Sequence, residues 1–432
     1  MKLRSLSVWR WLFVAIFASL LLGVAACSDD EEAGPSGTQQ FDGDIKIGFL
    51  LDLSGPGGAT ATTLSHQVGG KSAIDAINAD GGVEVAGKKY RLVQVIVDAK
   101  SDPVQTSAGA LDLLSQGVSG VYIGSAVFAD QAYQQLKGKV VSWSASPGVT
   151  YHIDSAVPIP GEGPTNNPTL FSNIDAFHPI VLAHLKMAVE AYPAIKKIGI
   201  LATNAPIGIQ LTASVEKASN ELGLTFVGSE LAPFNTSDLS SFVTNLKAKG
   251  PDFVFFVTLP SIIEGVNAAI EGNLAKYYGV WTLRPIEIAR QLRPLGNAVV
   301  ISPDWRLPMH DGLVPDKYKD AVTKLGDLPG GEPRHTGWAI SEWDWIHNLA
   351  QAYEKAGTFT DPLLVANALR GQVYSGDFGS TDVLANQTSR GTIGQMIKDG
   401  NTYTVWGWDS IDAVLADKPP LFKEAAPATE VE

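Results

Sequence analysis

Residues 45–56 read IKIGFLLDLSGP, and this stretch decides the fold class. Apolar residues fill its first seven positions apart from Lys46 and Gly48, which is typical of a strand buried on both faces of a sheet. The remaining residues, from Asp52 to Pro56, favour a loop. A buried strand that opens into a Gly/Pro loop before a helix is how α/β domains present a ligand-contacting loop at the carboxyl end of the sheet. We therefore expect an α/β fold.

The strand-then-helix unit repeats along the chain in two series. Apolar runs predict further strands at residues 90–97, 120–124, 139–143, 196–202, 224–231, 252–258, 277–282 and 297–302. Helical periodicity predicts helices at residues 62–78, 102–116, 128–136, 179–191, 208–222, 239–246, 261–270 and 285–292. Such alternation implies parallel strands joined by right-handed crossovers. Beyond Pro303 the pattern changes to longer helices at 336–355 and 361–369, followed by β-structure at 391–396 and 402–408.

Composition excludes several classes of function. The net charge of −13 over 432 residues argues against a nucleic-acid partner, which requires clustered Lys and Arg. The single cysteine, Cys27, permits neither an intrachain disulfide nor a cysteine-based metal site, and the seven histidines show no metal-ligand spacing. The chain lacks a G-x-S-x-G nucleophile elbow, and we expect Glu342 and Asp344 to form a solvated helix face rather than an acid–base pair. We therefore expect no metal, no cofactor and no enzymatic activity.

The N-terminus carries a targeting sequence. A positively charged start precedes an apolar run at residues 11–24, which is of signal-peptide length and short for a membrane span. Small residues before Cys27 indicate a lipoprotein signal peptide at residues 1–26 with lipidation of Cys27, and an ordinary signal peptide is the alternative. Residues 27–41 are acidic and then Gly/Ser/Pro-rich, so we expect a flexible tether between the membrane and an extracytoplasmic domain.

Two stretches resemble one protein family. IKIGFLLDLSGP, and AIDAINADGGVEVAGKKYRLVQVIVDAKSDPVQ at residues 73–105, resemble the opening of type I periplasmic binding proteins, and most closely their leucine/isoleucine/valine-binding branch. The shared elements are Asn78-Ala79, Gly81-Gly82, Gly87, Asp98 and Asp102-Pro103. The order of the later elements also resembles this family, from about residue 42 to 410. Members of this branch are receptors of branched-chain amino acid ABC importers.

The resemblance implies two doubly wound α/β lobes, joined by three crossovers, with the ligand cleft between them. Lobe 1 would comprise residues 42–172 and 304–378, and lobe 2 residues 173–303 and 390–412. The implied partners are a small-molecule solute (an amino acid, an amide or a related carboxylate) and the membrane subunits of an ABC permease, and the implied state is a monomer. The tail at 418–432 is rich in Pro and Glu, and we expect it to be disordered.

The resemblance places ligand-binding residues of lobe 1 at the carboxyl ends of its strands. Family members hold the ligand carboxylate with hydroxyl-bearing residues after the fourth strand, a place that Ser144 and Ser146 occupy here. The alternative is that these hydroxyls only cap a turn. After the third strand, Ser125 keeps one hydroxyl and Phe128 adds an aromatic ring.

Several expected contacts in lobe 2 depart from the family. Ile207 replaces a tyrosine, Leu259 stands where an aromatic residue is expected, and Trp281-Thr282 occupy the place of the acidic residue that binds the ligand ammonium. A buried ammonium without an anionic partner is costly, so the candidate ligands include a carboxylate without an amine, an amide and an aromatic compound. In lobe 1, Trp338 at the start of a helix is the tryptophan that we expect to reach the ligand.

The combined prediction is an extracytoplasmic, lipid-anchored solute receptor of an ABC importer. It would capture the solute between its lobes and deliver it to a membrane permease. The alternative is a sensory module that passes ligand binding to a signalling partner, although the sequence contains no recognisable output domain.

Overall fold

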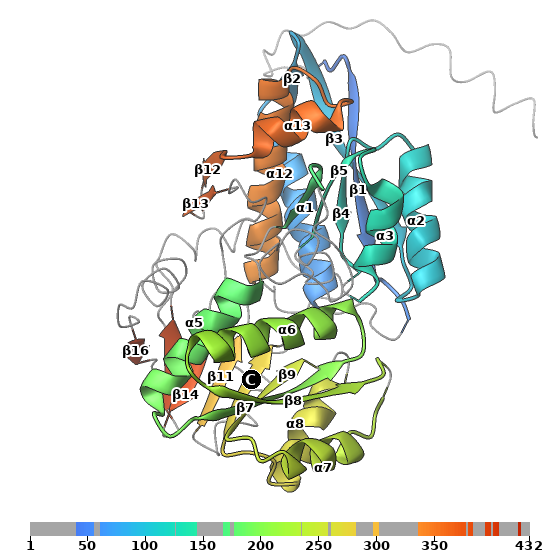
Figure 1. The fold of residues 1–432 in the computed structure, drawn as a ribbon. Coiled ribbons are helices and arrows are strands. Elements are labelled where there is room, and N and C mark those ends of the chain that lie inside the picture. The colour runs from blue at the N-terminus through green and yellow to red at the C-terminus, as the bar shows by residue number, and fades with distance from the viewer. Residues whose placement is uncertain are drawn as a thin grey trace, which may run out of the picture. The chain divides into compact units, whose positions relative to one another are not determined.

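The part of the chain that the structure describes is built around two large sheets (Figure 1). The computed structural model describes residues 40–55, 61–125, 127–144, 167–172, 177–234, 236–257, 261–281, 297–301, 336–376, 379–382, 394–398, 401–405 and 422–424. The predicted signal peptide, nearly all of the tether and the predicted helix at 285–292 lie outside these ranges. Within them, no helix combines the length and the apolar character needed to cross a membrane.

The first sheet has six strands in the order β2-β3-β1-β4-β5-β6. They are β1 (Gly43–Leu51), β2 (Val83–Val85), β3 (Lys88–Asp98), β4 (Gly120–Ile123), β5 (Val141–Ser144) and β6 (Leu170–Ser172). All neighbours pair in parallel except β2 and β3, which form an antiparallel pair. The predicted parallel arrangement is confirmed, whereas the sequence pattern does not predict β2 and β6, which have three residues each.

Helices cover both faces of this sheet. They are α1 (Ala61–Ala79), α2 (Pro103–Ser115), α3 (Ala129–Leu136), α12 (Thr336–Ala356) and α13 (Pro362–Leu369). Ile47 and Phe49 of β1 pack in an apolar cluster with residues of α1 and α12, and Leu50 packs in a second cluster with residues of α2 and α3. The prediction that the opening strand is buried on both faces is therefore confirmed.

α1 and α12 approach each other closely although they lie far apart in the sequence (Figure 1). A Cβ atom at Gly69 would lie 2.2 Å from the carbonyl oxygen of Ala339 in α12. A Cβ atom at Gly70 would lie 2.3 Å from the ring of Phe49 in β1. Both distances are far below van der Waals contact, so only glycine allows α1 to pack between β1 and α12.

The second sheet has eight strands in the order β16-β15-β14-β11-β10-β9-β7-β8. They are β7 (Lys197–Thr203), β8 (Thr225–Ala232), β9 (Phe253–Val257), β10 (Tyr277–Trp281), β11 (Asn297–Ile301), β14 (Gly394–Lys398), β15 (Asn401–Val405) and β16 (Phe422–Glu424). Its helices are α5 (Phe177–Ala191), α6 (Pro206–Glu221), α7 (Ser240–Ala248) and α8 (Ile262–Glu271). The strands from β7 to β11 pair in parallel, and β14, β15 and β16 add antiparallel pairs.

The C-terminal part of the chain contributes to both sheets. α12 and α13 pack against the first sheet, β12 (Val373–Gly376) and β13 (Gly379–Asp382) form a small hairpin, and β14 then joins the second sheet. β16 lies in the tail that is expected to be disordered, so this expectation is wrong for residues 422–424, which pair with β15.

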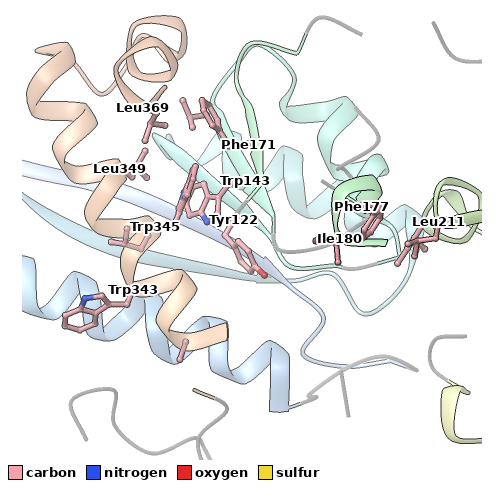
Figure 2. Packing of buried hydrophobic residues seen from close by; sticks show 14 of the residues in the cluster. Tyr122, Trp143, Phe171, Phe177, Ile180, Leu211, Trp343, Trp345, Leu349 and Leu369 are labelled. Carbon is pink, nitrogen blue, oxygen red and sulfur yellow. The ribbon is translucent and has the colours of Figure 1, made fainter. Parts of the chain in front are cut away.

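Aromatic side chains fill the space between the first sheet and α12 (Figure 2). The ring of Trp143 in β5 lies 5.7 Å from that of Trp345 in α12 and 6.0 Å from that of Tyr122 in β4. The ring of Phe171 in β6 also lies 5.7 Å from that of Trp345. Because such rings bury large apolar areas, α12 completes the core of a sheet whose strands all precede residue 173.

Candidate functional site

Polar side chains gather where the parallel strands of the first sheet end. β1 pairs with β4 so that Leu50 lies opposite Ile123, and β5 pairs with β6 so that Ser144 lies opposite Ser172. These registers bring the carboxyl ends of five strands to one edge, which we call the polar edge and define by Asp98, Asp52, Ser125, Ser144 and Ser172. In α/β sheets, ligands bind at this end of the strands.

Asp98 fixes the loop that follows β1. Its Oδ1 accepts hydrogen bonds from three backbone N–H groups, those of Leu53 (3.0 Å), Ser54 (3.2 Å) and Lys100 (2.9 Å). Its Oδ2 accepts a fourth from Ser54 Oγ at 2.6 Å. Burial raises the pKa of Asp98, but the four hydrogen bonds outweigh burial and hold the pKa below its ordinary value. The ionised Asp98 carboxylate therefore serves as the hydrogen-bond acceptor that holds the loop after β1 in place.

Asp52 is a second carboxylate at this edge, and only 7% of its surface is exposed. Its Oδ1 accepts a hydrogen bond from the Ser101 N–H at 2.9 Å. Burial raises the pKa of Asp52 to about 6, and the negative charge of Asp98 raises it further. The hydrogen bond from Ser101 and the nearby Ser125 hydroxyl act in the opposite direction and lower this pKa. The sequence pattern assigns Asp52 to a turn, although a carboxylate directly after the apolar run at residues 49–51 is a usable signal of a buried site.

The two predicted residues after β4 have different surroundings. Ser125 is fully buried, and its Oγ makes no hydrogen bond of ordinary geometry with any residue in the described ranges. Phe128 immediately precedes α3, and its ring contacts that of Phe234, which follows β8, edge to face at 5.9 Å. The contact between these rings thus connects the segment after β4 of the first sheet with the segment after β8 of the second sheet.

Ser144 is also fully buried, at the end of β5. Its Oγ donates a hydrogen bond to the carbonyl oxygen of Ile123 in β4 at 2.5 Å, and its own carbonyl oxygen accepts one from Ser172 Oγ at 3.2 Å. The Ser144 hydroxyl therefore connects β5 to the neighbouring strand β4 and helps to hold the sheet together. Ser146, the second hydroxyl predicted to hold a carboxylate, lies outside the described residues.

The predicted contacts from the second sheet are only partly described. Ile207 lies in the first turn of α6, is 1% exposed and packs in the large apolar cluster. Trp281 is the last residue of β10, opposite Ile301 of β11, and its side chain is not described. Leu259 and Thr282 lie outside the described residues. Ligand contact by these residues stays a prediction.

Trp338 lies in the first turn of α12, where its backbone but not its side chain is described. The other two tryptophans of this segment, Trp343 and Trp345, are buried in the core. Figure 2 shows them on α12, with Trp345 close to Trp143.

The prediction that Glu342 and Asp344 form a solvated face is wrong. Glu342 is fully buried, and Asp344 is 5% exposed. Glu342 Oε1 accepts a hydrogen bond from Trp143 Nε1 at 2.8 Å, and its Oε2 lies 3.3 Å from Nδ1 of His66 in α1. Helical spacing could have found this position, because Glu342 shares one face of α12 with the apolar residues at positions 339, 346 and 349.

Burial shifts the pKa values of Glu342 and His66 in opposite directions. Burial raises the pKa of Glu342 well above its ordinary value, although the Trp143 hydrogen bond opposes this shift. Burial also lowers the pKa of His66 to about 3. Both shifts have the same cause, burial, and both favour the uncharged forms over an ion pair. The pair therefore ties α1 to α12 and, through Trp143, to β5.

Metal ligation has no visible basis in the described part of the chain. No three His, Cys, Asp or Glu side chains there come together in a group that could hold a metal ion. The chemistry available at the polar edge is hydrogen bonding and charge recognition by carboxylates and hydroxyls.

Comparisons with known proteins point to one family. Residues 44–402 match the family described as periplasmic binding protein. A curated relative, the "Leu/Ile/Val-binding protein homolog 8" of Brucella abortus (strain 2308), is 24% identical over 402 residues, which cover 84% of this chain and 90% of the relative. Proteins of the same name from Brucella suis and Brucella melitensis match equally well.

Solved structures share the two-lobed fold. A solute-binding protein of an ABC transporter from R. palustris, in complex with benzoate, has a TM-score of 0.65 and 14% identity, and covers 90% of this chain and 100% of its own. The leucine binding protein LivK from Thermotoga maritima has a TM-score of 0.64 and 16% identity, with 84% and 98% coverage. LivJ from Streptococcus pneumoniae, in complex with isoleucine, has a TM-score of 0.60 and 21% identity, with 83% and 97% coverage. These likenesses confirm the predicted α/β fold of two lobes.

Proposed function

The chain belongs to the periplasmic binding protein family, and on this premise we propose that it is the extracytoplasmic solute receptor of an ABC importer. The match of residues 44–402 carries the proposal, because it extends from β1 in the first sheet to β14 in the second. The family is one of receptors and not of enzymes. The proposal includes the chemical class of the solute, attachment of the chain to the membrane through lipid, and docking of the receptor on a membrane permease.

The proposed mechanism uses two lobes that close on the solute. Lobe 1 comprises residues 42–172 and 304–378, and lobe 2 comprises residues 173–303 and 390–412. The return of the chain from α12 and α13 on the first sheet to β14 in the second supports this division. A solute that contacts both lobes stabilises the closed form through its higher affinity for that form, and the closed form then docks on the permease as a monomer.

The proposed solute is small and polar or bears a carboxylate: an amino acid, an amide or a related carboxylate. The name of the Brucella relatives and the isoleucine and benzoate complexes of the structural neighbours support this range. All the contacts expected from the resemblance remain part of the proposal. In lobe 1 they are Ser125, Phe128, Ser144, Ser146 and Trp338, and in lobe 2 they are Ile207, Leu259, Trp281 and Thr282.

A thermal-shift screen of the purified chain tests the receptor function. The panel pairs each amino acid with its deaminated acid and its amide, and includes benzoate. A solute at 100 times its dissociation constant adds about 2.7 kcal/mol to the stability of the folded state, so a bound solute raises the melting temperature measurably. A panel in which no member raises it overturns the proposed solute class.

We propose further that the chain is anchored by lipid on Cys27 after cleavage of residues 1–26, because small residues precede this sole cysteine. Two acyl chains or more give stable membrane attachment. In a bacterial host supplied with radiolabelled palmitate, the chain should incorporate label and sediment with membranes, and Cys27→Ser should do neither. Equal labelling of Cys27→Ser contradicts the anchor.

A further inference from the structure

We propose that Asp52 and Ser125 form a subsite for a cationic nitrogen of the solute at the polar edge of the first sheet. The inference rests on the proposed receptor function and adds the chemical group that the receptor selects. The resemblance places charge recognition near Trp281-Thr282, where the sequence has no carboxylate. The structure assigns this role to a carboxylate of the first sheet instead.

The two side chains belong to the ends of neighbouring strands. Leu50 of β1 lies opposite Ile123 of β4, and the Gly124 N–H donates a hydrogen bond to the Leu50 carbonyl oxygen at 2.8 Å. Asp52 and Ser125 each lie two positions beyond these paired residues. They therefore stand next to each other just past the last backbone pair, where a ligand of an α/β sheet is expected. The influence of Ser125 on the titration of Asp52 agrees with this proximity.

Both groups keep hydrogen-bonding capacity. Among the described residues, Asp52 accepts one hydrogen bond, from the Ser101 N–H to Oδ1, and its Oδ2 accepts none of ordinary geometry. Ser125 Oγ is buried and makes no hydrogen bond of ordinary geometry within the described ranges, although it is close enough to Asp52 to act on its pKa as a donor. Ser125 acts on Asp52 as a hydrogen-bond donor, but a hydroxyl supplies only one donor. A buried carboxylate has about four acceptor sites, so Asp52 keeps room for a donor from outside.

The charges around the pair favour a cation. No Lys, Arg or His of the described residues forms an ion pair with Asp52. The charged group that acts on it is Asp98, which has the same sign. A buried carboxylate without a counter-charge is costly, and an ammonium group both neutralises it and donates hydrogen bonds. An anionic solute group at this position would face two carboxylates.

One substitution separates this role from the part that Asp52 plays in the fold. The Ser101 N–H belongs to a turn in which Lys100 and Ser101 have left-handed φ angles of 57° and 51°. In Asp52→Asn the amide oxygen can still accept that hydrogen bond, so the turn is kept and the charge is removed. Asp44→Asn is the matched control, because Asp44 lies near the amino end of β1, the strand that Asp52 follows, and pairs with Arg91 at the surface.

The test uses calorimetric titration of the full chain with the amino acid that raises the melting temperature most, and with its deaminated acid. We expect Asp52→Asn to bind the amino acid at least about thirtyfold more weakly, as found for truncated charge pairs in desolvated sites. Ser125→Ala should bind it several-fold more weakly, and Asp44→Asn should bind it like the unmodified chain. The deaminated acid should bind weakly to all four proteins.

Three results overturn the inference. The first is an unchanged affinity of Asp52→Asn for the amino acid. The second is a screen in which only deaminated acids or neutral compounds bind, which leaves the receptor function intact. The third is a screen in which nothing binds, which overturns the proposed solute class as well. If Asp52→Asn does not fold, Ser125→Ala decides, since it removes one hydroxyl only, and an unchanged affinity of that variant also overturns the inference.

Discussion

Replacing Glu342 by alanine tests the buried link between α1, α12 and β5. Trp143 Nε1 loses its acceptor at 2.8 Å, and His66 Nδ1 loses its partner at 3.3 Å. Each buried polar group left unsatisfied costs about 1–3 kcal/mol, and loss of the side chain's packing adds to this cost. We therefore expect Glu342→Ala to lower the free energy of unfolding by about 3–5 kcal/mol.

Two further variants make this prediction specific. Glu342→Gln keeps the volume, an acceptor for Trp143 and a donor for His66, so it should cost about 1 kcal/mol or less. Glu216→Ala, on the exposed side of α6, should stay within about 0.5 kcal/mol of the unmodified chain. Urea unfolding followed by tryptophan fluorescence measures all three. A loss below about 1 kcal/mol for Glu342→Ala, or equal losses for Ala and Gln, would refute the reasoning.

Two other predictions concern stability. Gly69→Ala should lower the free energy of unfolding by at least about 2 kcal/mol, because its Cβ would lie 2.2 Å from the Ala339 carbonyl oxygen. Gly117→Ala is the control and should cost less, because Gly117 lies in an open turn. Equal losses for the two variants in urea unfolding would contradict the close contact between α1 and α12. Asp52 has a pKa of about 6 in the folded chain against 3.8 when unperturbed, so the folded state binds more protons than the unfolded state between these values. Its contribution to stability should fall by about 2 kcal/mol as the pH rises from 4 to 7. Comparing the pH dependence of Asp52→Asn with that of the unmodified chain isolates this contribution, and parallel curves would contradict it.

The sequence predicts the sheets well where the signal is local. The strand at residues 45–51 is a continuous apolar run, and Asp102 before Pro103 marks the start of α2, where its carboxylate accepts hydrogen bonds from the Val104 and Gln105 N–H groups at 2.9 Å. Strands of three residues, such as β2 and β16, carry too little pattern to be recognised. They form because a neighbouring strand offers backbone groups for pairing, and sequence spacing does not contain that information.

The candidate site is harder to predict, because the role of each polar side chain depends on a distant partner. Ser144 follows an apolar strand and resembles a ligand contact, yet its hydroxyl bonds to Ile123 of another strand. Asp52 resembles a turn residue until the register of β1 and β4 brings Ser125 beside it. Glu342 resembles a surface residue because its partners precede it by 199 and 276 positions.

The long sequence separations across the α12 interface also bear on how the chain folds. The first sheet ends at Ser172, but its aromatic core closes only when Trp345 and the rest of α12 have docked on Trp143 and Phe171. Contacts of such high contact order form late and slow the overall folding rate. A nascent chain that ends before Trp345 would hence expose the rings of that core, and native packing of the N-terminal sheet must wait for synthesis of α12.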